Sequence, residues 1–502
     1  MIKPQHVAEI SGKTFDVTVI GGGINGTAIA RRFAHAGYSV LLIEQGEFGC
    51  GSSSRSSRIM HCGLNYLAEV LHARSPKEKI RNLGLARRMM IEREKLWREL
   101  PGRLVPRPFL IPIRVGDAVG PLAYDLAFRS LRLLGGYRLA LNYRRFSGRD
   151  LQDHPCRPWF GPDLIGLVEF SELVFEWPEG ICHDYAIDAA EQGAKILNYT
   201  ELCSACRTNE GWSLRLRDVS GEVKKPISVK TTHVINMSGV GSDAVNQMSP
   251  GLDIEPHTVT RNKGCHIAMR LPPVFAGHGI LRRNALGHLF LAVPWQDFHI
   301  IGPTETAVTM PEVVPRVTME DISTLLAAVD ENLPGIQINT DAILASWAGY
   351  RPAAFSKGNS RGEWQRRIHL ASREGNKKGI WLSMAWGRLA DHRITANEVF
   401  DHVAVADGRT EKVAARLPAV RPRLPDDWKL SGGAAPRDLK DVMFARLGLG
   451  WSGDLGRSSA TRIAQMMSDD PDMTAALVTD YNAWIDTEFL SFREGVAPKV
   501  GQ

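Results

Sequence analysis

A glycine turn near the start of the chain limits the fold more than any other feature of the sequence. Residues 15–20 read F-D-V-T-V-I, an apolar strand, and Gly21, Gly23 and Gly26 follow in a G-x-G-x-x-G spacing. A helical stretch then ends at Gly37, and a second apolar strand ends at Glu44. Such glycines give a tight turn, room for a pyrophosphate at the helix N-terminus and close packing of helix on strand. Glu44 is placed where its carboxylate can accept hydrogen bonds from a ribose diol, so the pattern predicts a βαβ site for an adenine dinucleotide.

Composition excludes several other classes of protein. The 502 residues are 44% hydrophobic and 23% charged, and at ~100–200 residues per domain they predict two to four domains. No window approaches the ~18 apolar residues of a membrane-spanning helix, and the first residues lack a signal peptide, so we expect a cytoplasmic protein. A net charge of +6 does not call for a nucleic acid partner. Seven cysteines with a single C-x-x-C, at residues 203–206, predict neither a disulfide framework nor a metal site.

The rest of the chain alternates helical and strand patterns, which indicates a mixed α/β protein. Helical periodicity covers 66–100, and short strands are expected at 263–269, 289–294 and 298–302. Strands running into glycine turns are expected at 233–241 and 380–387, the second followed by a helix through residue 399. Prolines at 418, 422 and 425 mark a linker, and 438–492 reads as a small helical appendage.

A polar loop carries a resemblance to a known family. Residues 51–58 read G-S-S-S-R-S-S-R and lead into I-M-H-C-G-L-N-Y-L, a run of hydroxyl and guanidinium donors. The stretch resembles T-S-S-x-S-S-K/R-L-I-H-G-G-L-R-Y-L of the flavin-dependent glycerol-3-phosphate dehydrogenases, within the group that includes D-amino-acid oxidase. The resemblance implies FAD, bound without a covalent link. The implied cofactor residues are Gly21, Gly23, Gly26, Glu44, Ser52, Ser53, Ser56, Ser57, Arg58, Gly239 and Gly387.

Further motifs match the family in the same order along the chain. N-M-S-G-V-G at 236–241 resembles N-A-T-G-P-W, K-G-C-H at 263–266 resembles K-G-S-H, and A-G-Y-R-P at 348–352 resembles S-G-V-R-P. Residues 384–393, M-A-W-G-R-L-A-D-H-R, stand where the family has V-F-G-G-K-L-T-T-Y-R. The resemblance spans about residues 14–400. It implies a discontinuous FAD-binding Rossmann-like domain of the glutathione-reductase type interleaved with a mixed-sheet substrate domain. A linker over 401–430 and a helical appendage over 431–502 would follow.

The resemblance also implies the residues that handle substrate. His266 is the expected base, because it matches K-G-x-H and a histidine needs little tuning to accept an alcohol proton. Arg351 is the expected anion anchor, with Arg366 a second candidate, since a guanidinium holds a phosphate or carboxylate by two hydrogen bonds. His61 and Tyr66 are expected near the isoalloxazine ring in positioning roles. His392, standing where the family has tyrosine, is a weaker candidate.

Departures from the family pattern lie in the region that binds substrate. Asn65 replaces an arginine, Arg388 replaces a lysine, and Ala390 with Asp391 replaces paired threonines. One lost cation and one added carboxylate weaken the case for a dianionic phosphate at the same place. We still expect Arg351 and Arg388 to favour an anionic substrate.

The implied activity is oxidation of a secondary alcohol in a small polyol phosphate, with electrons passing through FAD to a quinone-like acceptor. Two alternatives stay open: an amine or amino-acid oxidase of the same superfamily, and a flavin-binding protein that has lost catalysis. Residues 121–146 combine leucines with arginines and suit the surface of an anionic bilayer. An amphipathic helix pair covering the catalytic domain explains that stretch equally well.

Overall fold

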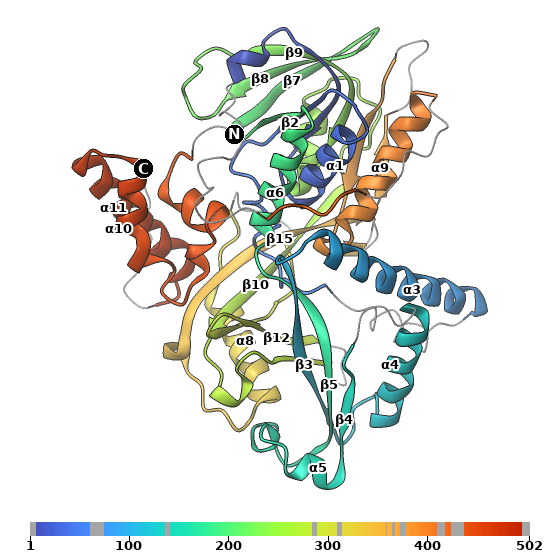
Figure 1. Ribbon diagram of the computed structural model, residues 1–502, viewed down its shortest axis with the longest axis vertical. Helices are drawn as coiled ribbons and strands as arrows, with labels where there is room; N and C mark the ends of the chain where they lie inside the picture. Colours follow the sequence, from blue (N-terminus) through green and yellow to red (C-terminus); the bar gives the residue numbers. More distant parts are fainter. Residues whose placement is uncertain are drawn as a thin grey trace.

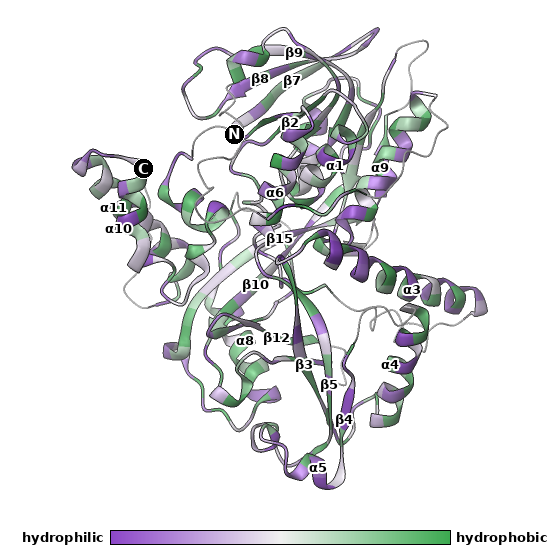
Figure 2. Cartoon of the chain, viewed as in Figure 1, coloured by the Kyte–Doolittle hydropathy of each residue, from purple (hydrophilic) through white to green (hydrophobic). Residues whose placement is uncertain are grey.

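The computed structural model describes residues 7–60, 75–135, 141–283, 289–308, 314–357, 359–363, 367–371, 378–408, 417–422 and 436–493. Two large sheets lie one above the other in Figure 1, and the C-terminal helices pack to one side of their junction. Figure 2 shows hydrophobic and hydrophilic residues mixed along both sheets, whereas helix α3 (Pro76–Glu99) is mainly hydrophilic. None of the described helices is long and apolar enough to cross a lipid bilayer.

The first sheet is built around the predicted βαβ unit. Within the described residues its strands lie in the order β17, β18, β9, β1, β2, β6, with β8 beside β9 and β7 beside β8. Strands β18, β9, β1, β2 and β6 run parallel. The bounds are β1 Thr14–Ile20, β2 Val40–Ile43, β6 Lys195–Leu197, β7 Thr200–Thr208, β8 Gly211–Asp218, β9 Ile227–Asn236, β17 Arg367–Leu370 and β18 Trp381–Ala385.

Strands β2 and β18 and the second half of β1 are buried on both faces, which explains why these stretches are largely apolar rather than alternating. One face, with Val17 and Leu42, packs in a core cluster with α1 (Ile24–Ala34), α6 (Pro178–Glu191) and α9 (His392–Ala406). The other face, with Leu41 and Trp381, packs against residues of β7 and β8. The glycine turn after β1 therefore sits at the carboxyl end of a strand whose last four residues are buried.

The second sheet is mainly antiparallel and forms the lower half of Figure 1. Its order is β16, β15, β10, β13, β12, β11, β3, β5, β4, with β14 beside β10. The bounds are β3 Leu104–Arg114, β4 Arg144–Phe146, β5 Leu164–Phe175, β10 Val259–Met269, β11 Gly279–Arg283, β12 Leu289–Trp295, β13 Phe298–Ile301, β14 Thr306–Ala307, β15 Ile343–Ser356 and β16 Asn359–Glu363. Helix α8, Met319–Asn332, shares a core cluster with this sheet.

The remaining helices lie around the two sheets. They are α3 Pro76–Glu99, α4 Pro121–Gly135, α5 Gly148–Gln152, α10 Arg457–Met467 and α11 Pro471–Phe489, with a π-helical turn at Asp441–Arg446. Short 3-10 turns cover Val7–Ile10, Arg157–Trp159, Gly239–Gly241, Pro273–Phe275, Thr340–Ala342, Leu389–Asp391 and Leu449–Trp451. We refer to residues 436–493 as the C-terminal appendage; its aromatic residues share one core cluster with the second sheet.

Most predicted elements are confirmed, and one alternative is wrong. The βαβ unit, the strands at 263–269, 289–294 and 298–302, and the helical appendage are present. Residues 121–146 do not form a helix pair, because 144–146 is the edge strand β4, hydrogen-bonded to β5. The described part of the predicted linker, 417–422, is held in place: Val420 N–H donates to the carbonyl of Glu99.

Candidate functional site

At two of the three glycines of the turn a side chain would collide with the backbone, and at the third there is space beside the backbone. Gly21 has φ +107°, and a Cβ there would lie 2.5 Å from the carbonyl oxygen of Met237 on the neighbouring chain segment. A Cβ on Gly26 would lie 1.8 Å from the carbonyl oxygen of Gly21, so helix α1 can pack against the turn only with glycine there. Gly23 is different, since Ser53 Oγ, at 3.2 Å, is all that a Cβ would meet within 4 Å. The side of the turn at Gly23 is therefore open to a ligand.

The N-terminus of α1 is bordered by residues from two other segments. Ser53 Oγ accepts the Ile24 N–H at 3.0 Å, which caps the helix in place of its own N-cap residue, Gly23. A Cβ on Gly387 would lie 2.7 Å from Asn25 Nδ2, so the turn after β18 also closes on this helix end. The buried Asn25 Oδ1 accepts no hydrogen bond from the described residues. The helix dipole and the backbone N–H groups at the start of α1 together make this end of the helix suited to binding an anion.

Glu44 lies at the end of β2 with its carboxylate turned toward the glycine turn. Its Oε2 accepts the Gly22 N–H at 2.6 Å, and its Oε1 accepts the Gly46 N–H at 2.9 Å. Burial raises the pKa of Glu44, and these backbone N–H groups partly oppose that shift. Gly22 is a residue that the motif did not single out. A Cβ there would lie 2.5 Å from the Phe48 ring and 2.8 Å from Glu44 Cβ.

The serine-rich loop connects the dinucleotide turn to the second sheet. Ser52 Oγ donates to the carbonyl of Tyr350 on β15 at 2.6 Å, and Ser56 Oγ accepts the Arg58 N–H at 3.3 Å. Ser57 Oγ lies 3.0 Å from His266 Nε2 on β10. The loop thus bridges the predicted cofactor side and the predicted base.

His266 is buried, and its environment keeps it neutral. Its Nδ1 has no hydrogen-bond partner among the described residues, and its ring stacks on Trp347 at 5.7 Å and 17°. Burial, with the positive charges of Arg351 and Arg58, lowers the pKa of His266 to about 3. A neutral imidazole with one unpartnered nitrogen has the capacity to accept a proton from a bound molecule.

Arg351 and Arg388 each have an acidic neighbour. Arg351 Nη1 lies 3.6 Å from Glu305, and its Nη2 donates to the carbonyl of Thr304 at 3.4 Å. Arg388 Nε lies 3.6 Å from Asp391, whose Oδ1 accepts the Arg388 backbone N–H. The added carboxylate Asp391 is therefore paired with Arg388, and Arg351 has an acidic neighbour of its own in Glu305. The site has less net positive charge than two free arginines would give it.

Arg58 is held away from solvent by aromatic rings. It is 1% exposed, and its guanidinium lies 4.1 Å from the centroid of the Trp295 ring and 4.3 Å from that of Trp451. Glu179 is 4.0 Å away, and burial lowers the pKa of Arg58 to about 10. Its direct role toward a cofactor stays a prediction. One of its two indole contacts, Trp451, belongs to the C-terminal appendage, and the other, Trp295, ends β12.

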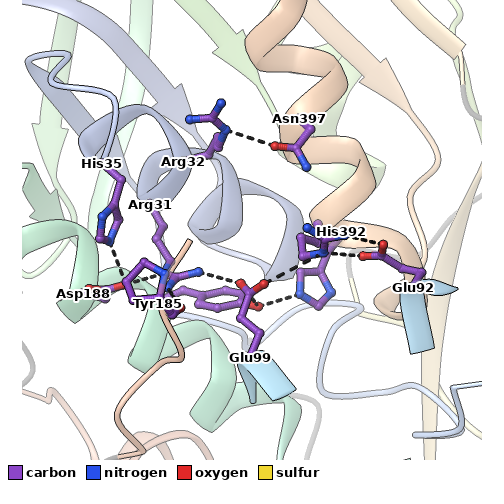
Figure 3. Close-up of polar contacts among 11 residues, drawn as sticks. Arg31, Arg32, His35, Glu92, Glu99, Tyr185, Asp188, His392 and Asn397 are labelled. Atoms are coloured by element: carbon purple, nitrogen blue, oxygen red, sulfur yellow. Dashed lines mark hydrogen bonds and ion pairs between the residues drawn. The ribbon is translucent and has the colours of Figure 1, made fainter. Parts of the chain in front are cut away.

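Some of the predicted site residues are outside the part of the chain that the structure describes, and one lies in a different part of the fold. His61, Tyr66, Asn65 and Arg366 are outside the described residues. Gly239 has φ +61°, and a Cβ there would meet nothing within 4 Å; its role toward the cofactor stays a prediction. His392 is wrong as a substrate-side candidate, because it lies in the buried polar cluster of Figure 3, where its Nε2 is 2.8 Å from Tyr185 Oη.

That cluster joins the helices α1, α3, α6 and α9, which pack on the face of the first sheet that contains Val17 and Leu42. Arg31 of α1 pairs with Glu99 of α3 at 2.6 Å and with Asp188 of α6, and Arg393 of α9 pairs with Glu92 of α3 at 2.5 Å (Figure 3). Arg31 also donates to the carbonyl of Pro418. With Arg32, which donates to Asn397, the cluster holds three arginines and three carboxylates, so its charges balance and we assign it a structural role.

Comparison with known proteins identifies the class of site. Residues 16–393 match the model of the FAD-dependent oxidoreductase family. The chain belongs to this family. Its cofactor is FAD, and the residues around α1 fit it: a helix N-terminus where a Cβ on Gly23 would meet only Ser53 Oγ, a carboxylate at the end of β2, and a buried Asn25 Oδ1 without a hydrogen-bond partner among the described residues.

Several proteins similar to this chain are named as enzymes that act on glycerol phosphate. The aerobic glycerol-3-phosphate dehydrogenase of Staphylococcus epidermidis is 26% identical over 409 residues, which cover 80% of this chain and 69% of that protein. Among solved structures, the glycerol-3-phosphate dehydrogenase from Bacillus halodurans complexed with FAD has a TM-score of 0.68 at 17% identity, covering 99% and 98% of the two chains. The L-alpha-glycerophosphate oxidase from Mycoplasma pneumoniae has a TM-score of 0.58 at 16% identity, covering 81% and 98%. These structures share the fold, and the first includes the region of the appendage.

Proposed function

We propose that this FAD-dependent oxidoreductase oxidises the secondary alcohol of a small polyol phosphate, such as glycerol 3-phosphate, to the ketone. A quinone-like molecule would then accept the electrons. The observation that carries the proposal is a buried, neutral His266 on β10, within the electrostatic reach of Arg351 on the paired strand β15. The names of the relatives, aerobic glycerol-3-phosphate dehydrogenases, support the same substrate class.

The chemistry needs a proton acceptor and an electron acceptor. FAD, when bound, supplies the acceptor for the two electrons and the hydrogen that leave the carbinol carbon. The hydroxyl proton would pass to Nδ1 of His266, the nitrogen that has no partner among the described residues. Ser57, at Nε2, would fix the orientation of the ring. A C–H and an O–H bond break, and a C=O bond forms.

An anionic group on the substrate would assist this proton transfer. The charge of Arg351 lowers the pKa of His266, so an anion bound to Arg351 offsets that charge and makes the imidazole a stronger base. Because Glu305 and Asp391 already neutralise part of the positive charge, a single anionic group suits the site better than two. A phosphate monoester hydrogen-bonded to one edge of the Arg351 guanidinium meets this requirement.

The proposal is tested by mixing the holoenzyme anaerobically with polyols and their phosphates and following flavin bleaching. Rapid bleaching by a polyol phosphate is expected. Bleaching by amines or amino acids instead, with hydrogen peroxide formed in air, would support an amine oxidase. No bleaching by either class would support a flavin-binding protein without this activity.

Replacing Arg351 with Met should raise the Michaelis constant for the phosphorylated substrate by at least ~10-fold, because a hydrogen bond to a charged group contributes ~1.5–3 kcal/mol. The unphosphorylated polyol should change much less. Arg270→Met, which removes an exposed arginine just beyond β10, is the matched control. Steady-state kinetics with both substrates checks this, and equal effects on both would contradict an anionic substrate.

We also propose that α4 attaches the protein to the inner face of an anionic membrane, where a quinone is accessible. Leu122, Leu126 and Leu133 are 75%, 66% and 66% exposed and, with Arg129, lie on one face of the helix. The neighbouring α3 is largely hydrophilic in Figure 2, with exposed Ile80 near its start. Exposed leucines beside arginines suit the boundary between headgroups and acyl chains.

Substituting both Leu122 and Leu126 with Asp should lower binding to phosphatidylglycerol vesicles by at least ~10-fold, since each buried leucine contributes ~1.5–3 kcal/mol. Co-sedimentation of the holoenzyme measures this. Val405→Asp, an equally exposed apolar position on α9, is the control and should bind like the unmodified protein. Equal loss in both variants, or no binding by the unmodified protein, would contradict attachment through α4.

A further inference from the structure

The loop that carries Ser57 is held in an unfavourable backbone conformation. Arg58 has φ +59°, the left-handed region that side chains other than glycine rarely adopt. Such a conformation persists only where surrounding contacts fix it. The guanidinium of Arg58 contacts two indole rings, of Trp295 and Trp451, and lies near the carboxylate of Glu179 and the carbonyl of Glu176. The Arg58 carbonyl accepts the Phe175 N–H at 2.7 Å.

Trp451 belongs to the C-terminal appendage and is itself fixed on several sides. Its Nε1 donates to Glu179 Oε1 at 2.8 Å, and its carbonyl accepts the Trp295 Nε1–H at 3.1 Å. Its ring meets Phe444 edge-on at 5.0 Å and Phe489 at 5.9 Å. Because these contacts come from both the appendage and the core, Trp451 is a rigid surface for Arg58.

The appendage makes a second contact with the same loop. Arg55 Nη2 lies 3.0 Å from Glu488, and its guanidinium lies 5.2 Å from the centroid of the Phe489 ring. Arg55 and Arg58 stand on either side of Ser56 and Ser57. The appendage therefore contacts both ends of the segment that presents Ser57 to His266.

His266, the partner of Ser57, is also supported by the C-terminal appendage. His266 stacks on Trp347, and Trp347 in turn contacts Trp451 at 5.4 Å. One indole of the appendage thus backs both Arg58, next to Ser57, and Trp347, beneath His266. Neither contact reaches the reacting atoms directly.

We propose that Trp451 is a positioning residue, through which the C-terminal appendage holds residues 55–58 and keeps Ser57 against His266. The effect on catalysis rests on the proposed function of His266, whereas the effect on the loop does not. Loss of the indole should free Arg58 from its left-handed conformation and lengthen the contact between Ser57 and His266.

The loop itself is tested by hydrogen–deuterium exchange of the holoenzyme. In Trp451→Leu, peptides covering residues 52–60, and the Phe175 N–H that donates to the Arg58 carbonyl, should exchange at least ~10-fold faster. Trp484→Leu is the matched control, because it removes an indole that contacts Phe444 and Phe489 and neither Arg58 nor Trp347 in the described contacts. Unchanged exchange in Trp451→Leu, or equal acceleration in both variants, would overturn the proposal.

The catalytic consequence has its own measurement. Anaerobic flavin reduction by the substrate should slow at least ~10-fold in Trp451→Leu at saturating substrate, with FAD content and the Michaelis constant little changed. Trp451→Phe, which keeps a ring over Arg58, should recover most of the rate and also guards against misfolding of the leucine variant. A rate equal to that of the Trp484→Leu control would overturn the positioning role. If no substrate reduces the unmodified protein, the proposed function fails, and the exchange experiment still decides whether Trp451 holds the loop.

Discussion

Gly23→Val is expected to give a folded protein that has lost its FAD. The space next to the Gly23 backbone, at the N-terminus of α1, is nearly empty. A Cβ on Gly23 would meet only Ser53 Oγ within 4 Å. Valine carbons there would occupy the space through which a pyrophosphate approaches the helix N-terminus. We expect affinity for FAD to fall by at least ~100-fold, about 2.7 kcal/mol.

The ratio of flavin to protein absorbance in the purified variant measures this loss, and circular dichroism reports the fold. Gly120→Val is the matched control, since that glycine precedes α4 and a Cβ there meets nothing within 4 Å. Gly26→Val is a poorer test, because its Cβ would collide with the Gly21 carbonyl and disturb the fold itself. A Gly23→Val protein that keeps stoichiometric FAD would contradict the proposed approach of the pyrophosphate.

The parts of the fold that were predictable are those in which neighbouring residues decide the structure. A strand, a glycine turn, a helix and a strand follow one another within 30 residues, and each is fixed by its own apolarity or by backbone sterics. A further local signal was overlooked: Ser75-Pro-Lys-Glu78 is a capping box with proline in the first turn, and α3 begins there.

The parts that were not predictable depend on contacts between distant segments. Residues 144–146 are apolar and basic enough for an amphipathic helix, yet pairing with β5 makes them a strand. Ser53 caps α1 across 29 residues of chain, and Ser57 meets His266 across 209. Composition and spacing give no measure of such pairings, so Arg58 reads as a phosphate ligand in the sequence and lies between two indoles in the structure.

The charge of the site shows the same limit. Glu305 comes near Arg351 because β14, which follows Glu305, and β15, which carries Arg351, both pair with β10. Asp391 is three residues from Arg388, a spacing that allows the pair to be anticipated. Counting arginines alone therefore overstates the positive charge available to a substrate.

His266→Ala should slow anaerobic flavin reduction by ~10²–10⁴ while leaving FAD content unchanged, because a positioned base contributes about that factor. His266 is buried, it contacts Ser57, and its Nδ1 is unpartnered among the described residues, which is the arrangement a proton acceptor requires. His299→Ala is the control, since it removes another buried histidine of the same sheet, bonded to the carbonyl of His278. An undiminished rate in His266→Ala would remove this residue from the mechanism.

The pH dependence gives His266 a second and independent signature. Its pKa is lowered to about 3 by burial and by the charges of Arg351 and Arg58, so the neutral, proton-accepting form persists until the pH falls toward 3. With an unphosphorylated substrate, kcat/KM should therefore show no acid limb near the ordinary histidine pKa of about 6.5. With the phosphorylated substrate, the bound anion offsets Arg351, so the acid limb of kcat from His266 should lie at a higher pH than that of kcat/KM. An acid limb near pH 6.5 with the neutral substrate, absent from His266→Ala, would show that this histidine titrates freely and is not held in the buried, charge-flanked position that makes it the base.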